Sequence, residues 1–116
     1  MLRGYHCGML VVTVTESTPA STTLVVSGEL DTPGAERLLA RLDRLLGQGH
    51  RSVVLDLSAV TFCDSSGISA LVRGHARASA AAGRLRLSAA SPQVTRVLEV
   101  SGLARMLGLQ STVVTP

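Results

Sequence analysis

Two short runs of β-branched and other apolar residues come first in the chain. Residues 9–14 read MLVVTV and residues 23–28 read TLVVSG, with a polar Ser/Thr/Pro segment between them. Apolar runs on either side of such a segment are typical of a β-hairpin. The pattern therefore predicts two antiparallel strands within residues 9–28.

The spacing of apolar residues then changes to that of a helix. Thr32 can cap a helix, and Pro33 suits its first turn, where a missing N–H costs nothing. The apolar stripe that follows comprises Ala35, Leu38, Leu39, Leu42, Leu45 and Leu46. Charged residues occupy the opposite side, so we expect an amphipathic helix that ends at Gly47.

Strand patterns return twice in the rest of the chain. Residues 52–57 (SVVLDL) and 84–89 (RLRLSA) predict two more strands, and residues 61–63 prolong or follow the first of them. The first run is nearly continuous in apolar character. We therefore expect it to be buried on both faces of a sheet.

Each of these strands is followed by a helical pattern. One helix is expected to start at Ser65 or Ser66 and to run to about Ala82. The next is expected to be capped by Ser91 and to end at Gly102. The side chains predicted to face inward are Ile68, Leu71 and Val72 in the first helix and Val94, Val97 and Leu98 in the second.

The order of elements is ββαβαβα, followed by an apolar segment at 103–109 and a last strand or tail at 111–115. Strands that alternate with helices need crossover connections, so most of the sheet should be parallel. The predicted fold class is α/β, a mixed and mostly parallel sheet with an N-terminal antiparallel hairpin and helices packed against it. Residues 9–116 are expected to form one domain, preceded by a mobile extension at 1–8.

Composition removes several classes of function. Apolar residues make up 46% of the 116, but the chain has one Phe, one Tyr and no Trp, so its core must be aliphatic and bases have few aromatic faces to stack on. The formal charge is +3, every basic residue is Arg, and the arginines are scattered along the chain. A phosphate-binding stripe would need them gathered, so we expect no nucleic-acid partner.

The apolar runs are also too short to cross a membrane, and the first residues lack the apolar stretch of a signal peptide. We therefore expect a cytoplasmic protein with no membrane partner. Two cysteines, Cys7 and Cys63, do not make a disulfide framework and are expected to be reduced.

One segment stands apart as a candidate site: Asp64-Ser65-Ser66-Gly67, at the point where a predicted buried strand gives way to a helix. Hydroxyl groups at a helix start lie beside unpaired N–H groups and the positive end of the helix dipole, where a phosphate is well tolerated. The alternative is that the three polar residues are only helix caps.

A cysteine-nucleophile site is a further alternative, made of Cys63, Asp64 and one of His6, His50 or His75. No nucleophile elbow, phosphate loop or metal-ligand cluster accompanies these residues. A small buried thiol at a strand end is the stronger interpretation. We expect no catalytic residues, no metal and no cofactor.

The stretch LDLSAVTFCDSSGISALV, residues 55–72, resembles the signature of STAS domains of bacterial anti-sigma-factor antagonists. Upstream, VSGELD at residues 26–31 is similar to that family's turn before its first helix, and SGL at 101–103 is similar to the motif after its third helix. The resemblance covers residues 9–110. It departs from the family pattern at Cys63 and at Pro33-Gly34.

The resemblance implies a mechanism. An unphosphorylated antagonist binds an anti-sigma factor that is itself a serine kinase, and this binding releases a sigma factor. The kinase then phosphorylates the serine that precedes the glycine, here Ser66, and a PP2C-type phosphatase removes the phosphate. The implied partner-binding residues are Asp31, Asp64, Ser65, Ser66 and Gly67, and the chain is expected to be a monomer or weak dimer.

Another role occurs on the same fold: a STAS adaptor subunit of a transport or lipid-trafficking complex. A neighbouring gene for a serine-kinase anti-sigma factor, or for an ABC permease, would separate the two roles.

The pattern also makes a prediction about residues 1–8, which have no strand or helix periodicity. A chain that begins at Met9 should melt within a few degrees of the full chain and bind its partner equally well. Thermal unfolding followed by circular dichroism measures the first property. A large loss of stability would mean that the extension packs on the domain.

Overall fold

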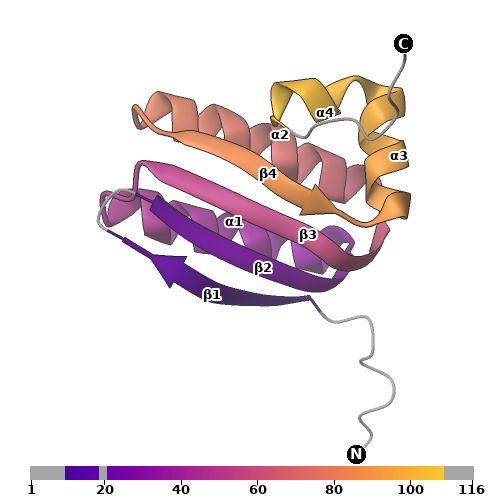
Figure 1. Ribbon diagram of the computed structural model, residues 1–116, viewed down its shortest axis with the longest axis horizontal. Helices are drawn as coiled ribbons and strands as arrows, with labels where there is room; N and C mark the ends of the chain where they lie inside the picture. The colour runs from indigo at the N-terminus through magenta and orange to yellow at the C-terminus, as the bar shows by residue number, and fades with distance from the viewer. Residues whose placement is uncertain (1–9, 19–20, 109–116) are drawn as a thin grey trace, which may run out of the picture.

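The computed structural model describes residues 10–18 and 21–108. These residues form a four-stranded sheet with helices packed against it, as the order of apolar patterns predicts (Figure 1). The elements are β1 (Val11–Ser17), β2 (Ser21–Leu30), α1 (Thr32–Gly47), β3 (Ser52–Cys63), α2 (Ser65–Ala80), β4 (Arg84–Ala90), α3 (Pro92–Ser101) and α4 (Leu103–Met106).

Strands follow one another across the sheet in the order of the sequence, β1-β2-β3-β4. β1 pairs antiparallel with β2, and the pairs β2–β3 and β3–β4 are parallel. The predicted N-terminal hairpin and the mostly parallel sheet are both confirmed. β1 and β4 form the two edges of the sheet (Figure 1).

Both crossover helices lie on the same face of the sheet. β2-α1-β3 and β3-α2-β4 each advance one strand in the same direction, and right-handed crossovers that advance in one direction put their helices on one side. α1 and α2 therefore pack side by side behind the sheet in Figure 1. Ala35, Leu39 and Ala70 form a small buried cluster of their own.

The core is aliphatic, as the composition requires, and lies between these helices and the sheet. Alternate residues of the strands point into it, and the apolar stripe of α1 covers them. Its largest side chains are leucines from β2, α1, β3, α2, β4 and α3, including Leu24, Leu38, Leu42, Leu55, Leu71, Leu87 and Leu98.

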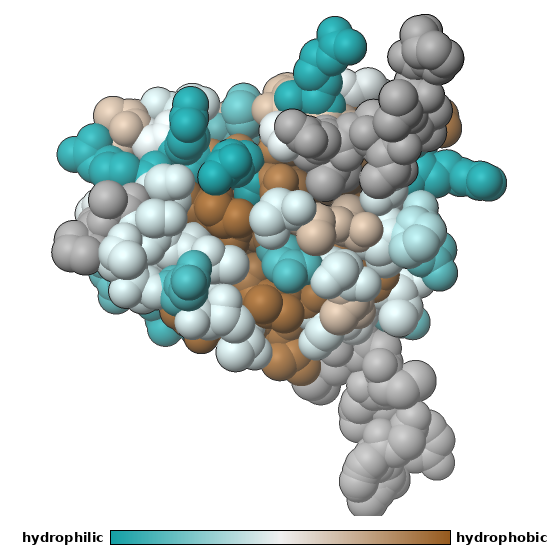
Figure 2. Space-filling view, in the orientation of Figure 1, coloured by the Kyte–Doolittle hydropathy of each residue, from teal (hydrophilic) through white to brown (hydrophobic). Residues whose placement is uncertain are grey.

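The expectation that residues 52–57 are buried on both faces is wrong. In β3, Val53, Leu55 and Leu57 are buried, whereas Val54 and Asp56 on the other face are only half-buried. The cause is the placement of both crossover helices on one side, which leaves the second face of the sheet open. Figure 2 looks onto that face and shows an apolar band across its middle.

Two inward positions on the helices also differ from expectation. Val72 of α2 is 38% exposed, because Leu71 and Ala70 take the positions that face the core. Val97 of α3 is half-buried, whereas Val94 and Leu98 are buried as expected.

β3 continues beyond residue 57, so residues 61–63 prolong it. The Asp56 carboxylate accepts hydrogen bonds from the backbone N–H and the hydroxyl of Ser58, at 2.9 and 2.6 Å. The strand register shifts at this point and pairing with β2 then resumes as far as Leu30 and Cys63. The segment around Ser58 is therefore an irregularity within β3, and β2 and β3 both continue toward the starts of α1 and α2.

The last described residues lie beside β4, where the Leu107 carbonyl accepts a hydrogen bond from Leu87 N–H at 2.8 Å. The helix cap predicted at Ser91 is present, since its Oγ accepts from Val94 N–H. The extension at residues 1–8, the strand start at Met9 and the strand or tail at 111–115 lie outside the described residues.

Candidate functional site

The candidate site forms where two adjacent strands end and two helices begin. The final paired residues of β2 and β3 are Leu30 and Cys63, so Asp31 and Asp64 follow them side by side. A hydrogen bond of 3.4 Å from Asp64 N–H to the Leu30 carbonyl extends the pairing by one residue. The starts of α1 and α2 are thereby brought together at one end of the sheet.

Both aspartates are helix N-caps. Asp31 Oδ1 accepts from Gly34 N–H at 3.0 Å, and Asp64 Oδ1 accepts from the N–H groups of Ser66 and Gly67 at 2.9 and 3.2 Å. The sequences D-T-P-G and D-S-S-G therefore build the same turn twice. They differ because Pro33 has no N–H to donate at the position that Ser66 occupies in α2.

This assignment corrects the interpretation of the three polar residues as caps. Asp64 alone caps α2, and Ser65 and Ser66 are the first and second residues of the helix. In the same way Asp31, rather than Thr32, caps α1. The hydroxyl of Ser66 is not needed to start the helix and is free for another role.

Each turn also needs its glycine, because the helix starts pack directly on the strand ends. A Cβ on Gly67 would lie 2.5 Å from the Leu30 carbonyl oxygen and 2.7 Å from Cys63 Sγ. A Cβ on Gly34 would lie 2.5 Å from the Glu29 carbonyl oxygen. Gly67 is itself buried, so it has little surface for a partner to contact. Its role in the site is to let the start of α2 pack closely against the end of β2.

The two turns are joined by a hydrogen bond between hydroxyl groups. Ser66 Oγ of α2 lies 2.7 Å from Thr32 Oγ1 of α1. Ser66 is half-buried, and Ser65 beside it is exposed. Thr32 was not predicted as a site residue, although its place one residue after an aspartate, in a turn that matches D-S-S-G, was a usable signal.

Phe62 is a second residue that the sequence analysis missed. It pairs with Glu29 near the end of β3 and is 46% exposed, although it is the only Phe in the chain. Exposed aromatic residues beside polar groups are frequent in protein–protein contacts. The signal available was the presence of the chain's one Phe two residues before Asp64.

Cys63 lies at the site but is not a nucleophile. Burial raises the pKa of its thiol to about 11, and the Asp64 carboxylate contributes in the same direction. A thiol with this pKa stays protonated at neutral pH. Its Sγ lies 3.7 Å from the Asp64 carbonyl oxygen.

No described histidine accompanies this thiol. His50 precedes β3, at the opposite end of that strand from Cys63, and its Nδ1 contacts Thr22 Oγ1. His75 lies ten residues after Ser65 in α2, which is about 15 Å along the helix. His6 lies outside the described residues.

The described residues offer neither a metal site nor a membrane-spanning helix. Within residues 10–18 and 21–108, no group of three or more His, Cys, Asp or Glu side chains is placed to hold a metal ion. In the same part of the chain, no helix has the length and apolar character needed to cross a bilayer.

The close approach at Gly67 predicts a difference between two glycine substitutions. Gly67→Ala should lower the free energy of unfolding by about 1–3 kcal/mol, because the new methyl group meets a backbone carbonyl. Gly47→Ala, at the end of α1, places its methyl group in open space and should be neutral or stabilising by up to about 1 kcal/mol. Urea unfolding of both variants measures this, and equal effects would contradict the packing argument.

The raised pKa predicts slow thiol chemistry at Cys63. In a Cys7→Ser variant, which leaves one thiol, reaction with Ellman's reagent at pH 8 should be at least about tenfold slower than that of a cysteine-containing peptide. The rate should rise as the pH approaches 11, because the reactive thiolate forms there. The same measurement in urea serves as the control, and a fast reaction of the folded protein at pH 8 would contradict the assignment.

The sequence of this chain is similar to a family model and to a curated protein. The family model described as "Mlab, STAS domain" matches residues 13–110. A curated relative, the anti-sigma F factor antagonist of Lysinibacillus sphaericus, is 32% identical over 77 residues, and the aligned part spans 66% of this chain and 66% of that protein. The alignment thus covers just under two thirds of the relative's length.

Solved structures of anti-sigma-factor antagonists are similar to this chain over more of its length. The anti-sigma-factor antagonist SpoIIAA in its unphosphorylated form is similar with a TM-score of 0.72 and 26% identity, over 82% of this chain and 84% of that one. SpoIIAA of Bacillus in its phosphorylated form is similar with a TM-score of 0.64 and 26% identity, over 82% and 86%. An anti-sigma-factor antagonist of Mycobacterium paratuberculosis is similar with a TM-score of 0.76 and 25% identity, over 91% and 89%. From the family model and the fold, the chain belongs to the STAS-domain family, and it is similar to members that are anti-sigma-factor antagonists.

Proposed function

We propose that this chain acts as an anti-sigma-factor antagonist whose binding is switched off by phosphorylation of Ser66. In its unphosphorylated form it binds an anti-sigma factor that is a serine kinase, and so releases a sigma factor. The observation that carries this proposal is the position of the Ser66 hydroxyl, half-buried between two helix starts and bonded to Thr32 rather than used as a cap. A PP2C-type phosphatase would restore the binding form.

The contact surface is formed by the residues around this hydroxyl. Asp31 and Asp64 flank it, Ser65 is exposed next to it, and Gly67 allows the backbone to approach closely. The exposed ring of Phe62 adds an apolar contact at the end of β3. We infer that the chain works as a monomer or weak dimer without catalytic chemistry of its own.

Phosphorylation would add both bulk and negative charge to this surface. A phosphate adds about −1.5 to −2 charges to Ser66. The backbone N–H groups of Ser66 and Gly67, which would otherwise bind it, already donate to Asp64. The new charge would therefore lie beside a carboxylate, without free donors from its own turn, and would be repelled or left unpaired at a partner surface shaped for a hydroxyl.

The structural relatives support a switch of this kind. SpoIIAA, which is similar to this chain over more than four fifths of its length, has been solved in an unphosphorylated and in a phosphorylated form. A fold that accommodates both states in a relative supports the same pair of states here.

An adaptor role in a transport or lipid-trafficking complex is the second candidate. The family model that matches is described as that of Mlab, and this observation favours keeping the candidate. An ABC permease encoded beside the gene, together with binding that is unaffected by changes at Ser66, would support it over the antagonist.

The proposal predicts a single phosphate, on Ser66, when the chain is incubated with ATP and its cognate serine-kinase anti-sigma factor. Intact-mass and fragment spectra locate it. Ser66→Ala should bind that partner and stay unmodified, while Ser66→Asp should bind it more weakly by about 1–3 kcal/mol, because a charge is left unpaired in the contact. Ser79→Asp, on an exposed position far along α2, is the matched control and should bind normally.

Folding stability must be measured in parallel. Since Asp64 caps α2, neither substitution at Ser66 removes the cap, and both variants should unfold close to the wild type. Equal binding by the wild type and by Ser66→Asp, or a phosphate found only on Ser65, would refute the proposed switch.

A further inference from the structure

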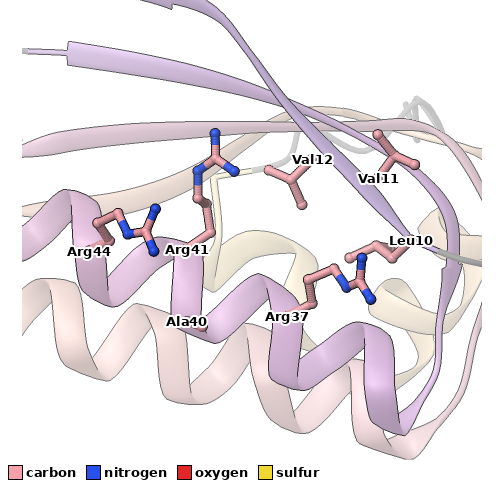
Figure 3. Close-up of a pocket in the computed structure, with 7 residues that line it drawn as sticks. All are labelled: Leu10, Val11, Val12, Arg37, Ala40, Arg41 and Arg44. Carbon is pink, nitrogen blue, oxygen red and sulfur yellow. The ribbon is translucent and has the colours of Figure 1, made fainter.

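A groove runs between β1 and α1, at the edge of the sheet. It has a volume of about 370 Å³ and is lined by Leu10, Val11 and Val12 on one side and by residues of α1 on the other. Figure 3 shows Arg37, Arg41 and Arg44 along the wall formed by α1, facing these apolar side chains. The groove thus has an apolar wall and a cationic wall.

The arginines form a row because of their spacing along α1. Positions 37, 41 and 44 are separated by four and three residues, so they share one side of the helix. The arginines were expected to be scattered, and for these three the expectation is wrong. None of the three forms an ion pair with a carboxylate within the described part of the chain.

The strand that forms the other wall has a free edge. β1 is the first strand of the sheet, and β2 is its one neighbour among the described strands. Pairing with β2 is regular from Val11 to Val14 and shifts only after Val14. Val11 is 51% exposed, and residues 11–14 include no charged side chain that would discourage another strand from pairing with this edge. An unpaired regular edge of this kind is a template for an added strand.

We propose that the groove binds an extended acidic peptide segment of a partner protein, added as a strand to the edge of β1. Its backbone would pair with the free edge, and alternate side chains would enter the groove. Successive arginines are about 6 Å apart along α1 where four residues separate them. Side chains at i and i+2 of a strand are about 6.7 Å apart. Acidic residues at alternate positions therefore match the arginine row.

Charge argues against two other occupants. Residues 1–9 of this chain carry no Asp or Glu and include Arg3, so they do not complement three arginines. A second copy of β1 carries one acidic residue, Glu16, which lies beyond the irregularity of the strand. A partner segment with several carboxylates fits the row better than either.

This surface is separate from the phosphorylation switch. It begins at Arg37, five residues after Thr32, and includes neither Ser66 nor Asp64. The inference does not depend on the proposed function, and its test needs no kinase.

The test uses the full chain and a fluorescently labelled peptide, Glu-Val-Glu-Val-Glu-Val, with fluorescence anisotropy as the readout. Saturable binding is expected, with amide resonance shifts confined to β1 and α1. Arg41→Glu should weaken it by about tenfold or more, because it reverses the central charge of the row. Arg84→Glu, on β4 at the opposite edge, makes the same change in net charge and should bind as the wild type. Arg41→Gln, which removes the charge without reversing it, should give a smaller loss.

Two further peptides separate strand addition from simple charge attraction. The sequence Arg-Val-Arg-Val-Arg-Val should not bind, because it presents cations to cations. An acidic peptide methylated on alternate backbone nitrogens should bind about tenfold more weakly, since it cannot pair with the edge. Equal binding of the methylated peptide, equal loss in Arg41→Glu and Arg84→Glu, or no saturable binding would each overturn the proposal. Self-association of the chain that Arg41→Glu abolishes would overturn it in favour of a second copy.

Discussion

The pairing of β2 with β3 as far as Leu30 and Cys63 is the constraint on which the site depends. Because the two parallel strands end at the same level, their next residues begin two helices side by side. Gly34 and Gly67 then let each helix start pack against the preceding backbone, at distances that no side chain permits. The contact between Thr32 and Ser66 is a result of this arrangement, since it joins residues 34 positions apart.

The repeated turn gives the site an unusual electrostatic character. A helix start ordinarily offers free N–H groups to an anion, and here the two capping carboxylates already accept from them. The same end of the sheet therefore carries two negative charges and a hydroxyl, with an exposed aromatic ring nearby. Such a surface suits recognition by a partner with complementary donors, and it is sensitive to any added negative charge.

Much of this fold was predictable because it is encoded locally. The change from strand to helix period at Thr32 and the caps around Asp64 and Ser91 depend on neighbours a few residues apart. The open face of the sheet was not predictable, because it depends on the direction in which both crossovers advance. Thr32 and Phe62 were not predicted for a similar reason, because each is placed in the site by a residue distant in the sequence. Thr32 contacts Ser66, and Phe62 pairs with Glu29. The arginine row could be read from helical spacing alone, but the strand opposite it could not.

The agreement between strand order and sequence order has a consequence for how the molecule assembles. Each new strand joins the edge left by the one before it, so the sheet can grow in a single direction as the chain leaves the ribosome, and each strand pairs with the strand that precedes it in the sequence. The edge of β1 is present from the first hairpin onward, whereas the surface around Ser66 exists only after β3 has paired and α2 has formed. The strand edge of a nascent chain is therefore exposed well before the two helix starts around Ser66 come together.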